Sequence, residues 1–166
     1  MSDSPIILLH GVRIFQRENL VLNNVDLSVQ KGEFLYLIGR TGSGKSSLMR
    51  TLYGDLPLKE GEGHVCGFDL SKLKRSQVPY LRRKIGIVFQ DFQLLTDRTV
   101  NDNLLFVLRA TGWNEAKRMD ERVQQVLEKV GLSNKGYKMP HELSGGEQQM
   151  LAIARAMMAR PSLLLL

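Results

Sequence analysis

The chain has 166 residues, the length of about one domain, and its 43% hydrophobic and 24% charged residues are typical of a globular protein with a buried core. Its single cysteine, Cys66, excludes an internal disulfide and fits a reducing compartment. Residues 1–5 lack the basic region of a signal peptide, and no apolar run approaches the ~20 residues that span a bilayer. We therefore expect a protein that is soluble, or that is attached to a membrane only through a partner.

The net charge of +6 raises the question of an anionic partner. The clearest basic cluster consists of Lys72, Lys74, Arg75, Arg82, Arg83 and Lys84. Sites for single-stranded nucleic acid interleave basic residues with aromatic ones, and only Tyr80 lies within this cluster. The pattern favours a solvated basic face, so we expect no nucleic-acid partner.

Two apolar runs at the start of the chain predict an antiparallel hairpin. Residues 6–14 are rich in strand formers, and in residues 20–29 the apolar positions 25, 27 and 29 alternate with polar ones. The polar residues 16–19 between the runs predict a turn. Phe15 stands at the end of the first run, where it is either a core residue or an aromatic face for a base, and the residues alone leave both readings open.

The next stretch fits G-x-x-x-x-G-K-[ST], the phosphate-binding P-loop, with the residues Gly39, Arg40, Thr41, Gly42, Ser43, Gly44, Lys45 and Ser46. Residues 33–38 before it predict a buried strand, and residues 47–53 after it predict a helix. The glycines allow the loop amides to face a phosphate at the positive end of that helix. Lys45 supplies charge for the β- and γ-phosphates, and the Ser46 hydroxyl is a ligand for Mg²⁺. An ordinary glycine-rich turn, the alternative, would not need this context.

The middle of the chain predicts shorter elements. Residues 57–63 predict a loop, residues 64–67 a short strand or turn, and residues 71–84 a partly helical segment. A buried strand follows at residues 85–89. Gln90 comes directly after it, at the end of the strand where binding sites gather, although a plain surface residue is the alternative.

Two helices are predicted between residues 91 and 140. Thr99 caps the first through Asp102, and Asn114 caps the second. Apolar residues recur at helical spacing in the second, and Gly131 ends it. We expect a helical insertion between core strands, or alternatively a helical layer of the same domain.

Residues 143–149 read Leu-Ser-Gly-Gly-Glu-Gln-Gln. Ser144 and Glu147 form a capping box that opens an amphipathic helix over residues 147–159. A capping box does not require two glycines. These glycines would expose backbone amides at a helix N-terminus, which predicts a second anion-binding site. After a break at Pro161, residues 163–166 predict the start of a buried strand.

The P-loop followed by this second motif resembles the ATP-binding-cassette (ABC) ATPases over nearly the whole chain. The resemblance implies an α/β P-loop fold, with a mostly parallel core sheet, an N-terminal antiparallel β subdomain and an inserted helical subdomain. Residues 1–90 would form the β subdomain and P-loop core of one domain, residues 91–142 the helical insertion, and residues 143–166 the signature helix with the start of the Walker B strand. The C-terminal part of the core would follow Leu166.

The resemblance also implies that two copies pair head to tail and clamp ATP between the P-loop of one and the signature of the other. Phe15 would stack on adenine, and Gln90 with Ser46 would contact Mg²⁺. The implied nucleotide-binding residues are Phe15, Gly39, Arg40, Thr41, Gly42, Ser43, Gly44, Lys45, Ser46, Ser47, Gln90, Ser144, Gly145, Gly146, Glu147 and Gln148. Met150 departs from the arginine that is usual in the family.

Residues 89–100 and the signature are most similar to the cell-division branch of the family, which implies a membrane subunit of the FtsX type at the inner face of the cell membrane. Lipoprotein-export and efflux ATPases of the family share much of this pattern. A P-loop kinase would have no use for residues 143–149, and only the charge favours a nucleic-acid-associated cassette.

The resemblance places an aspartate for Mg²⁺, a glutamate base and a switch histidine after the last strand, and none of the three is among the 166 residues. Whether the protein hydrolyses ATP therefore stays open. The alternative is a module that binds nucleotide without hydrolysis. We expect this chain to bind ATP, to release phosphate no faster than buffer, and to be marginally stable or prone to aggregation.

Overall fold

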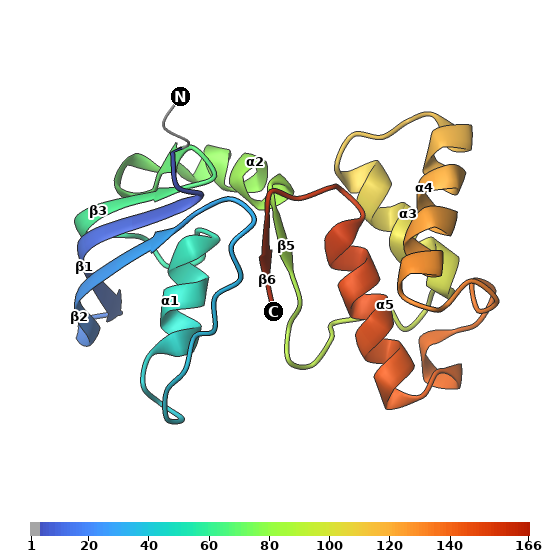
Figure 1. Ribbon diagram of the computed structural model, residues 1–166, viewed down its shortest axis with the longest axis horizontal. Helices are drawn as coiled ribbons and strands as arrows, with labels where there is room; N and C mark the ends of the chain where they lie inside the picture. Colours follow the sequence, from blue (N-terminus) through green and yellow to red (C-terminus); the bar gives the residue numbers. More distant parts are fainter. Residues whose placement is uncertain (1–3) are drawn as a thin grey trace. The chain divides into compact units, whose positions relative to one another are not determined.

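The computed structural model describes residues 4–166 and consists of two compact units that divide after Ile85 (Figure 1). The first unit contains an antiparallel sheet of four strands: β1 (Ile7–Gln16), β2 (Asn19–Val29), β3 (Glu60–Val65) and β4 (Phe68–Asp69). Their order in the sheet is β2-β1-β3-β4. The predicted hairpin is therefore confirmed as β1 and β2.

The prediction of a loop over residues 57–63 is wrong at its end, because β3 begins at Glu60. The two glycines that suggested a loop are there for close packing. A Cβ atom on Gly61 would lie 2.6 Å from the Gly11 carbonyl oxygen, and one on Gly63 would lie 2.7 Å from a Leu58 methyl group. Such contacts are too short for a side chain, so glycine allows β3 to lie against its neighbours.

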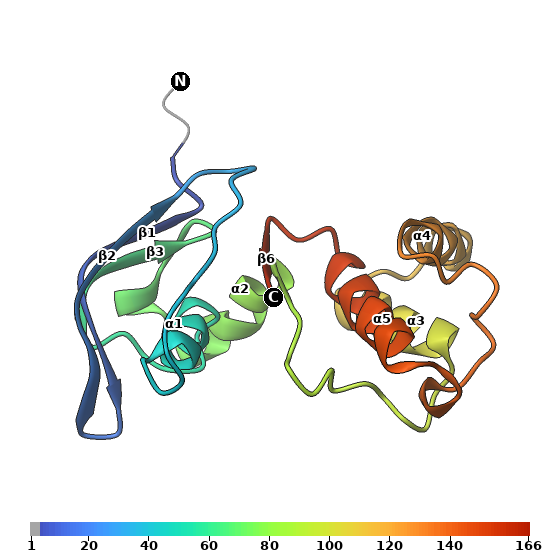
Figure 2. The same cartoon turned by 60° about the horizontal axis from the view of Figure 1, so that its bottom comes forward.

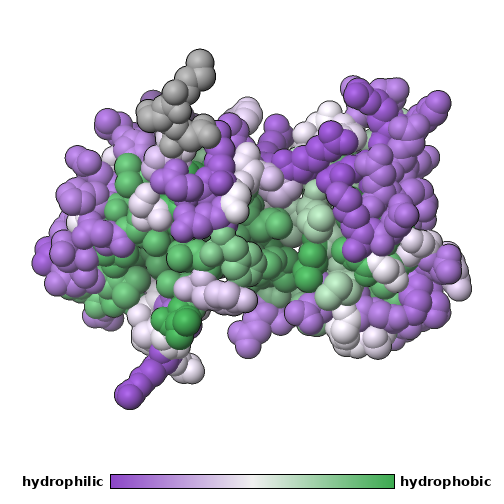
Figure 3. All heavy atoms as spheres, viewed as in Figure 1, coloured by the Kyte–Doolittle hydropathy of each residue, from purple (hydrophilic) through white to green (hydrophobic). Residues whose placement is uncertain are grey.

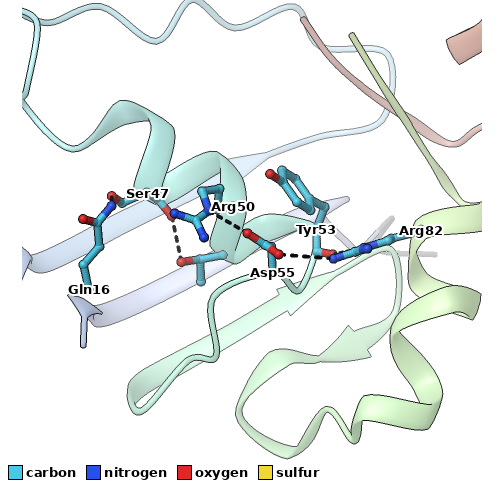
Figure 4. Close-up of polar contacts among 7 residues, drawn as sticks. Gln16, Ser47, Arg50, Tyr53, Asp55 and Arg82 are labelled. Atoms are coloured by element: carbon cyan, nitrogen blue, oxygen red, sulfur yellow. Dashed lines mark hydrogen bonds and ion pairs between the residues drawn. The ribbon is translucent and has the colours of Figure 1, made fainter. Parts of the chain in front are cut away.

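Helix α1 (Lys45–Leu52) lies against one face of this sheet (Figures 1 and 2). Its N-cap is Gly44, which has a φ of 94° and packs against β2, where an added Cβ would lie 2.8 Å from Leu22. At the other end of the helix, Asp55 accepts a hydrogen bond of 2.6 Å from Arg50 Nε and forms an ion pair with Arg82 (Figure 4). The unit also contains three short helical segments, namely η1 (Leu70–Lys72), η2 (Arg75–Gln77) and α2 (Val78–Arg83).

The predicted strand before the P-loop is not formed. Residues 33–38 have no strand in the structure, and their side chains are exposed, from 43% for Leu37 to 89% for Ile38. Figure 3 shows apolar residues at the surface of the molecule among more polar ones. A strand exists only where a neighbour completes its hydrogen-bond ladder, and no strand among residues 4–166 pairs with this segment. Apolar strand-forming composition was therefore not sufficient for a strand here.

The second unit is mostly helical. β5 (Ile85–Ile87) and β6 (Leu163–Leu165) pair side by side and run in the same direction (Figure 1). The helices are α3 (Val100–Ala110), α4 (Ala116–Lys129) and α5 (Gly145–Met157), with the short turn η3 (Pro140–Glu142) before α5. Buried residues of the three long helices and of the segments beside them form one apolar cluster, which includes Leu104, Leu108, Val126, Leu127, Leu151 and Met158.

Both predicted helix starts can be checked. Thr99 caps α3 as predicted, since its Oγ1 accepts a hydrogen bond of 3.1 Å from the Asp102 amide. The prediction of Asn114 as the cap of α4 is wrong by one residue, because the N-cap is Glu115 and no side chain caps this helix.

Met150, where an arginine was expected, packs against the apolar cluster. Within residues 4–166, no helix has the length and hydrophobicity needed to cross a membrane.

Candidate nucleotide-binding site

The P-loop residues form an exposed loop that is closed over Lys45, the first residue of α1. Lys45 Nζ donates hydrogen bonds of 2.6 Å to the Gly39 carbonyl oxygen and 2.8 Å to that of Arg40. Gly42 and Gly44 have φ angles of 79° and 94°, which favour glycine strongly. The ammonium group is thus held by the loop itself, at the positive end of a helix, and this arrangement suits an anion with several oxygens.

The two serines after Lys45 face different surroundings. Ser46 is exposed, and its hydroxyl makes no hydrogen bond within residues 4–166. Ser47 is only 3% exposed, and its hydroxyl accepts a hydrogen bond of 2.9 Å from Gln16 Nε2 (Figure 4). Ser46 is therefore available to a ligand or to Mg²⁺, whereas Ser47 ties α1 to β1 and can offer its backbone amide.

Phe15 belongs to the same end of β1. It precedes Gln16, whose side chain reaches the first turn of α1, and it is half-buried. Lys59 Nζ lies 5.9 Å from the centre of its ring. The ring is therefore only half-buried, at the end of β1 that is tied to α1 through Gln16.

The signature residues lie in the second unit, at the start of α5. Ser144 Oγ accepts a hydrogen bond of 3.2 Å from the Glu147 amide, and a Glu147 carboxylate oxygen accepts one of 2.9 Å from the Ser144 amide. The predicted capping box is therefore confirmed. Lys135 also hydrogen-bonds to Glu147, and this contact, together with the Ser144 amide, holds the pKa of Glu147 below its ordinary value.

Gly145 and Gly146 are exposed, and neither has a positive φ. A Cβ atom on either would meet nothing within 4 Å, so the fold of this unit does not require glycine at these two positions. Glycine here leaves the N-terminal amides of α5 uncovered, which suits the close approach of an anion. Gln148 is turned to its own unit, where Nε2 donates to the Pro140 carbonyl oxygen at 3.0 Å.

Gln90 is exposed in the turn that follows β5.

Two residues that sequence reasoning missed bind the segment that follows Gln90. Asn103, fully buried in α3, hydrogen-bonds to the backbone of Leu95, Arg98 and Thr99. Arg155 of α5 donates to the Gln93 carbonyl oxygen at 2.5 Å. Asn103 could have been found from the sequence, because it is a polar residue on the predicted buried face of an otherwise apolar helix.

Comparisons with known proteins agree with this arrangement. A family model for ABC transporters matches residues 22–166, and the chain belongs to this family. It is 43% identical over 154 residues to the cell division ATP-binding protein FtsE of Streptococcus pneumoniae serotype 2, covering 93% of this chain and 66% of that protein. For FtsE of Mycobacterium tuberculosis the identity is 47% over 144 residues, with 87% and 62% covered.

The methionine import ATP-binding protein MetN of Nocardia farcinica is 40% identical over 169 residues, which cover 99% of this chain and 50% of MetN. The chain thus spans one half to two thirds of the length of these relatives.

Among solved structures, the dimeric bacterial ABC transporter cassette MJ0796 superposes with a TM-score of 0.83 at 31% identity, covering 95% of this chain and 72% of that one. The same cassette in a post-hydrolysis state with ADP and Pi gives 0.82 at 30% identity, with the same shares covered. These neighbours confirm the predicted α/β fold of the ABC type.

Proposed function

We propose that this protein is the ATP-binding subunit of an ABC-type complex, with ATP and Mg²⁺ bound at the P-loop. The observation that carries the proposal is the loop around Lys45. Two carbonyl oxygens of the loop hold the ammonium group in place, and the Ser46 hydroxyl has no hydrogen-bond partner among residues 4–166. The amides of residues 39–47 would hold the phosphates, and Phe15 would stack on the base. Mg²⁺, held by Ser46 and Gln90, would offset the charge of the phosphates.

The proposal includes a pair of copies in which the signature of one contacts the nucleotide of the other. The pairing is supported by the exposed backbone amides of Gly145 and Gly146, because the fold of this unit does not require glycine at these positions. MJ0796, to which the chain is similar, is a dimer. Glu147 and Gln148 would act mainly by fixing the start of α5, since their side chains bond within their own unit.

An association experiment tests the pairing. The molecular mass is measured by analytical ultracentrifugation with and without a non-hydrolysable ATP analogue and Mg²⁺, at a protein concentration low enough that the nucleotide-free chain is monomeric. We expect the mass to rise toward twice the monomer value with the analogue, and Gly146→Val to abolish this rise. The melting temperature of the variant should stay at the wild-type value, because a side chain at Gly146 meets open space, and the variant should still bind the analogue as a monomer. A wild-type mass that does not respond to bound analogue would contradict the pairing.

We further propose that the complex acts in cell division, at the cytoplasmic face of the membrane, with an FtsX-type membrane subunit. The 43–47% identity to FtsE supports this assignment. Methionine import is the second candidate, since identity to MetN is 40% over 99% of the chain. Lipoprotein-export and efflux complexes are the remaining alternatives within the family.

Partner identification separates these candidates. The affinity-tagged protein is recovered from solubilised membranes of its own host, and the co-purified membrane proteins are identified by mass spectrometry. An FtsX-type protein is the expected result. Recovery of a methionine permease, and no division protein, would transfer the assignment to methionine import.

A further inference from the structure

The segment after Gln90 bends sharply without glycine. Phe92 and Gln93 have φ angles of 59° and 44°, in the left-handed region that side chains disfavour. Such a conformation persists only where its surroundings fix it. The turn itself supplies two short-range bonds, from the Phe92 amide to the Phe89 carbonyl oxygen and from the Gln93 amide to that of Asp91.

Contacts from two helices fix the segment from Gln93 onward. Arg155 of α5 donates to the Gln93 carbonyl oxygen at 2.5 Å. Leu94 packs against the apolar cluster of the second unit, and Asn103 of α3 bonds to both backbone groups of Leu95. The strained residues therefore lie directly between Gln90, which is exposed, and a segment bound to the helices.

Arg155 lies in the last turn of α5, the helix whose first turn carries Ser144, Gly145 and Gly146. A helix of 13 residues is a stiff rod of ~20 Å. The Nε atom of Arg155 is buried and finds no partner within residues 4–166, and burial lowers the pKa of its guanidinium. Burying this group is unfavourable, and among the described residues its one hydrogen bond is the bond to Gln93.

We propose that Arg155 is a positioning residue that fastens the segment after Gln90 to the signature helix, so that α5 and this segment move together. A shift of α5 caused by an anion at its first turn would then be passed to Gln90. This second statement rests on the proposed function, because it takes Gln90 and the signature as nucleotide-binding residues; the fastening itself does not.

Hydrogen exchange of the full chain without nucleotide tests the fastening. In Arg155→Met, which keeps the aliphatic volume and loses the donors, we expect amides of residues 91–95 to exchange about tenfold faster, as on loss of one hydrogen bond. Exchange in α3 and α4 should stay at the wild-type rate. Arg155→Lys keeps one donor and should restore slow exchange.

Arg122 is the matched control, since it is also a helical arginine that donates to backbone carbonyls, those of Met157 and Met158, and it is buried, whereas Arg155 is half-buried. Arg122→Met should lower the melting temperature and leave residues 91–95 at the wild-type rate. Should Arg155→Met not fold, Arg155→Gln, which is too short to reach the carbonyl, carries the same test. Unchanged exchange at residues 91–95, or a rise spread over the whole second unit, would overturn the inference. A wild-type chain that binds no ATP would count against the proposed function only.

Discussion

At the scale of single residues, Phe15 offers a way to separate base contacts from phosphate contacts. Stacking on a base contributes about 1–3 kcal/mol, so Phe15→Ala should weaken ATP binding roughly five- to hundredfold. Affinity for inorganic triphosphate should hardly change. Calorimetric titration with both ligands measures the difference, and Phe106→Ala, which removes an exposed aromatic side chain of the second unit, is the control. Equal losses for both ligands would mean that Phe15 acts through stability.

Glu147 predicts a pH dependence of stability. Lys135 and the Ser144 amide lower its pKa in the folded state from the ordinary 4.5. Its stabilising contribution is therefore fully present above pH 4.5 and is lost as the pH falls through the lowered folded value. Melting temperatures measured from neutral to acidic pH should fall less steeply below pH 4.5 for Glu147→Gln than for the wild type. Glu121→Gln, which removes an exposed carboxylate, should follow the wild-type curve.

Sequence reasoning found residues whose role depends on near neighbours in the chain. The P-loop residues, the Thr99 cap and the Ser144–Glu147 capping box are defined by spacings of a few positions, and the structure has both caps as predicted. Asn103 was missed although its partners lie only 4 to 8 residues away, whereas Arg155 was missed because its partner is set by tertiary packing. Arg155, for example, bonds to a backbone carbonyl 62 residues away, which no local pattern encodes.

At the scale of elements, α5 depends on its cap. Ser144→Ala should lower the free energy of unfolding by about 1 kcal/mol, the usual contribution of an N-cap. Urea unfolding followed by circular dichroism measures the loss, and Ser144→Thr, which keeps an acceptor oxygen, should recover most of it. An unchanged unfolding midpoint for Ser144→Ala would contradict the importance of the cap seen in the structure.

Strands were harder to predict than helices, for a physical reason. A helix satisfies its own backbone, so periodicity and caps were enough to predict that α3, α4 and α5 exist. The bounds differ in two places: the N-cap of α4 is Glu115 and not Asn114, and α5 spans Gly145–Met157 and not residues 147–159. A strand needs a partner that the local sequence does not contain. Residues 33–38 have strand composition and no ladder, whereas residues 60–63 have loop composition and a ladder with β1.

At the scale of the whole molecule, the exposed apolar segment predicts self-association. Phe34, Tyr36 and Ile38 are 72–89% exposed, and contiguous apolar surface of this kind drives association in water. Light scattering of the purified chain should show a mass that rises with concentration in the absence of nucleotide. Replacing Tyr36 and Ile38 by Gln should lower this mass. A chain that stays monomeric at all concentrations would contradict the exposure of this segment.

The central claim is that the loop around Lys45 binds ATP, and an equilibrium titration with Mg-ATP tests it most directly. We expect saturable binding to the wild-type chain and none to Lys45→Ala, since this change removes the charge that would pair with the β- and γ-phosphates. Both proteins should melt at similar temperatures, and Lys129→Ala, at an exposed lysine of α4, should bind as the wild type does. Equal ATP affinity of the wild type and Lys45→Ala would contradict the account.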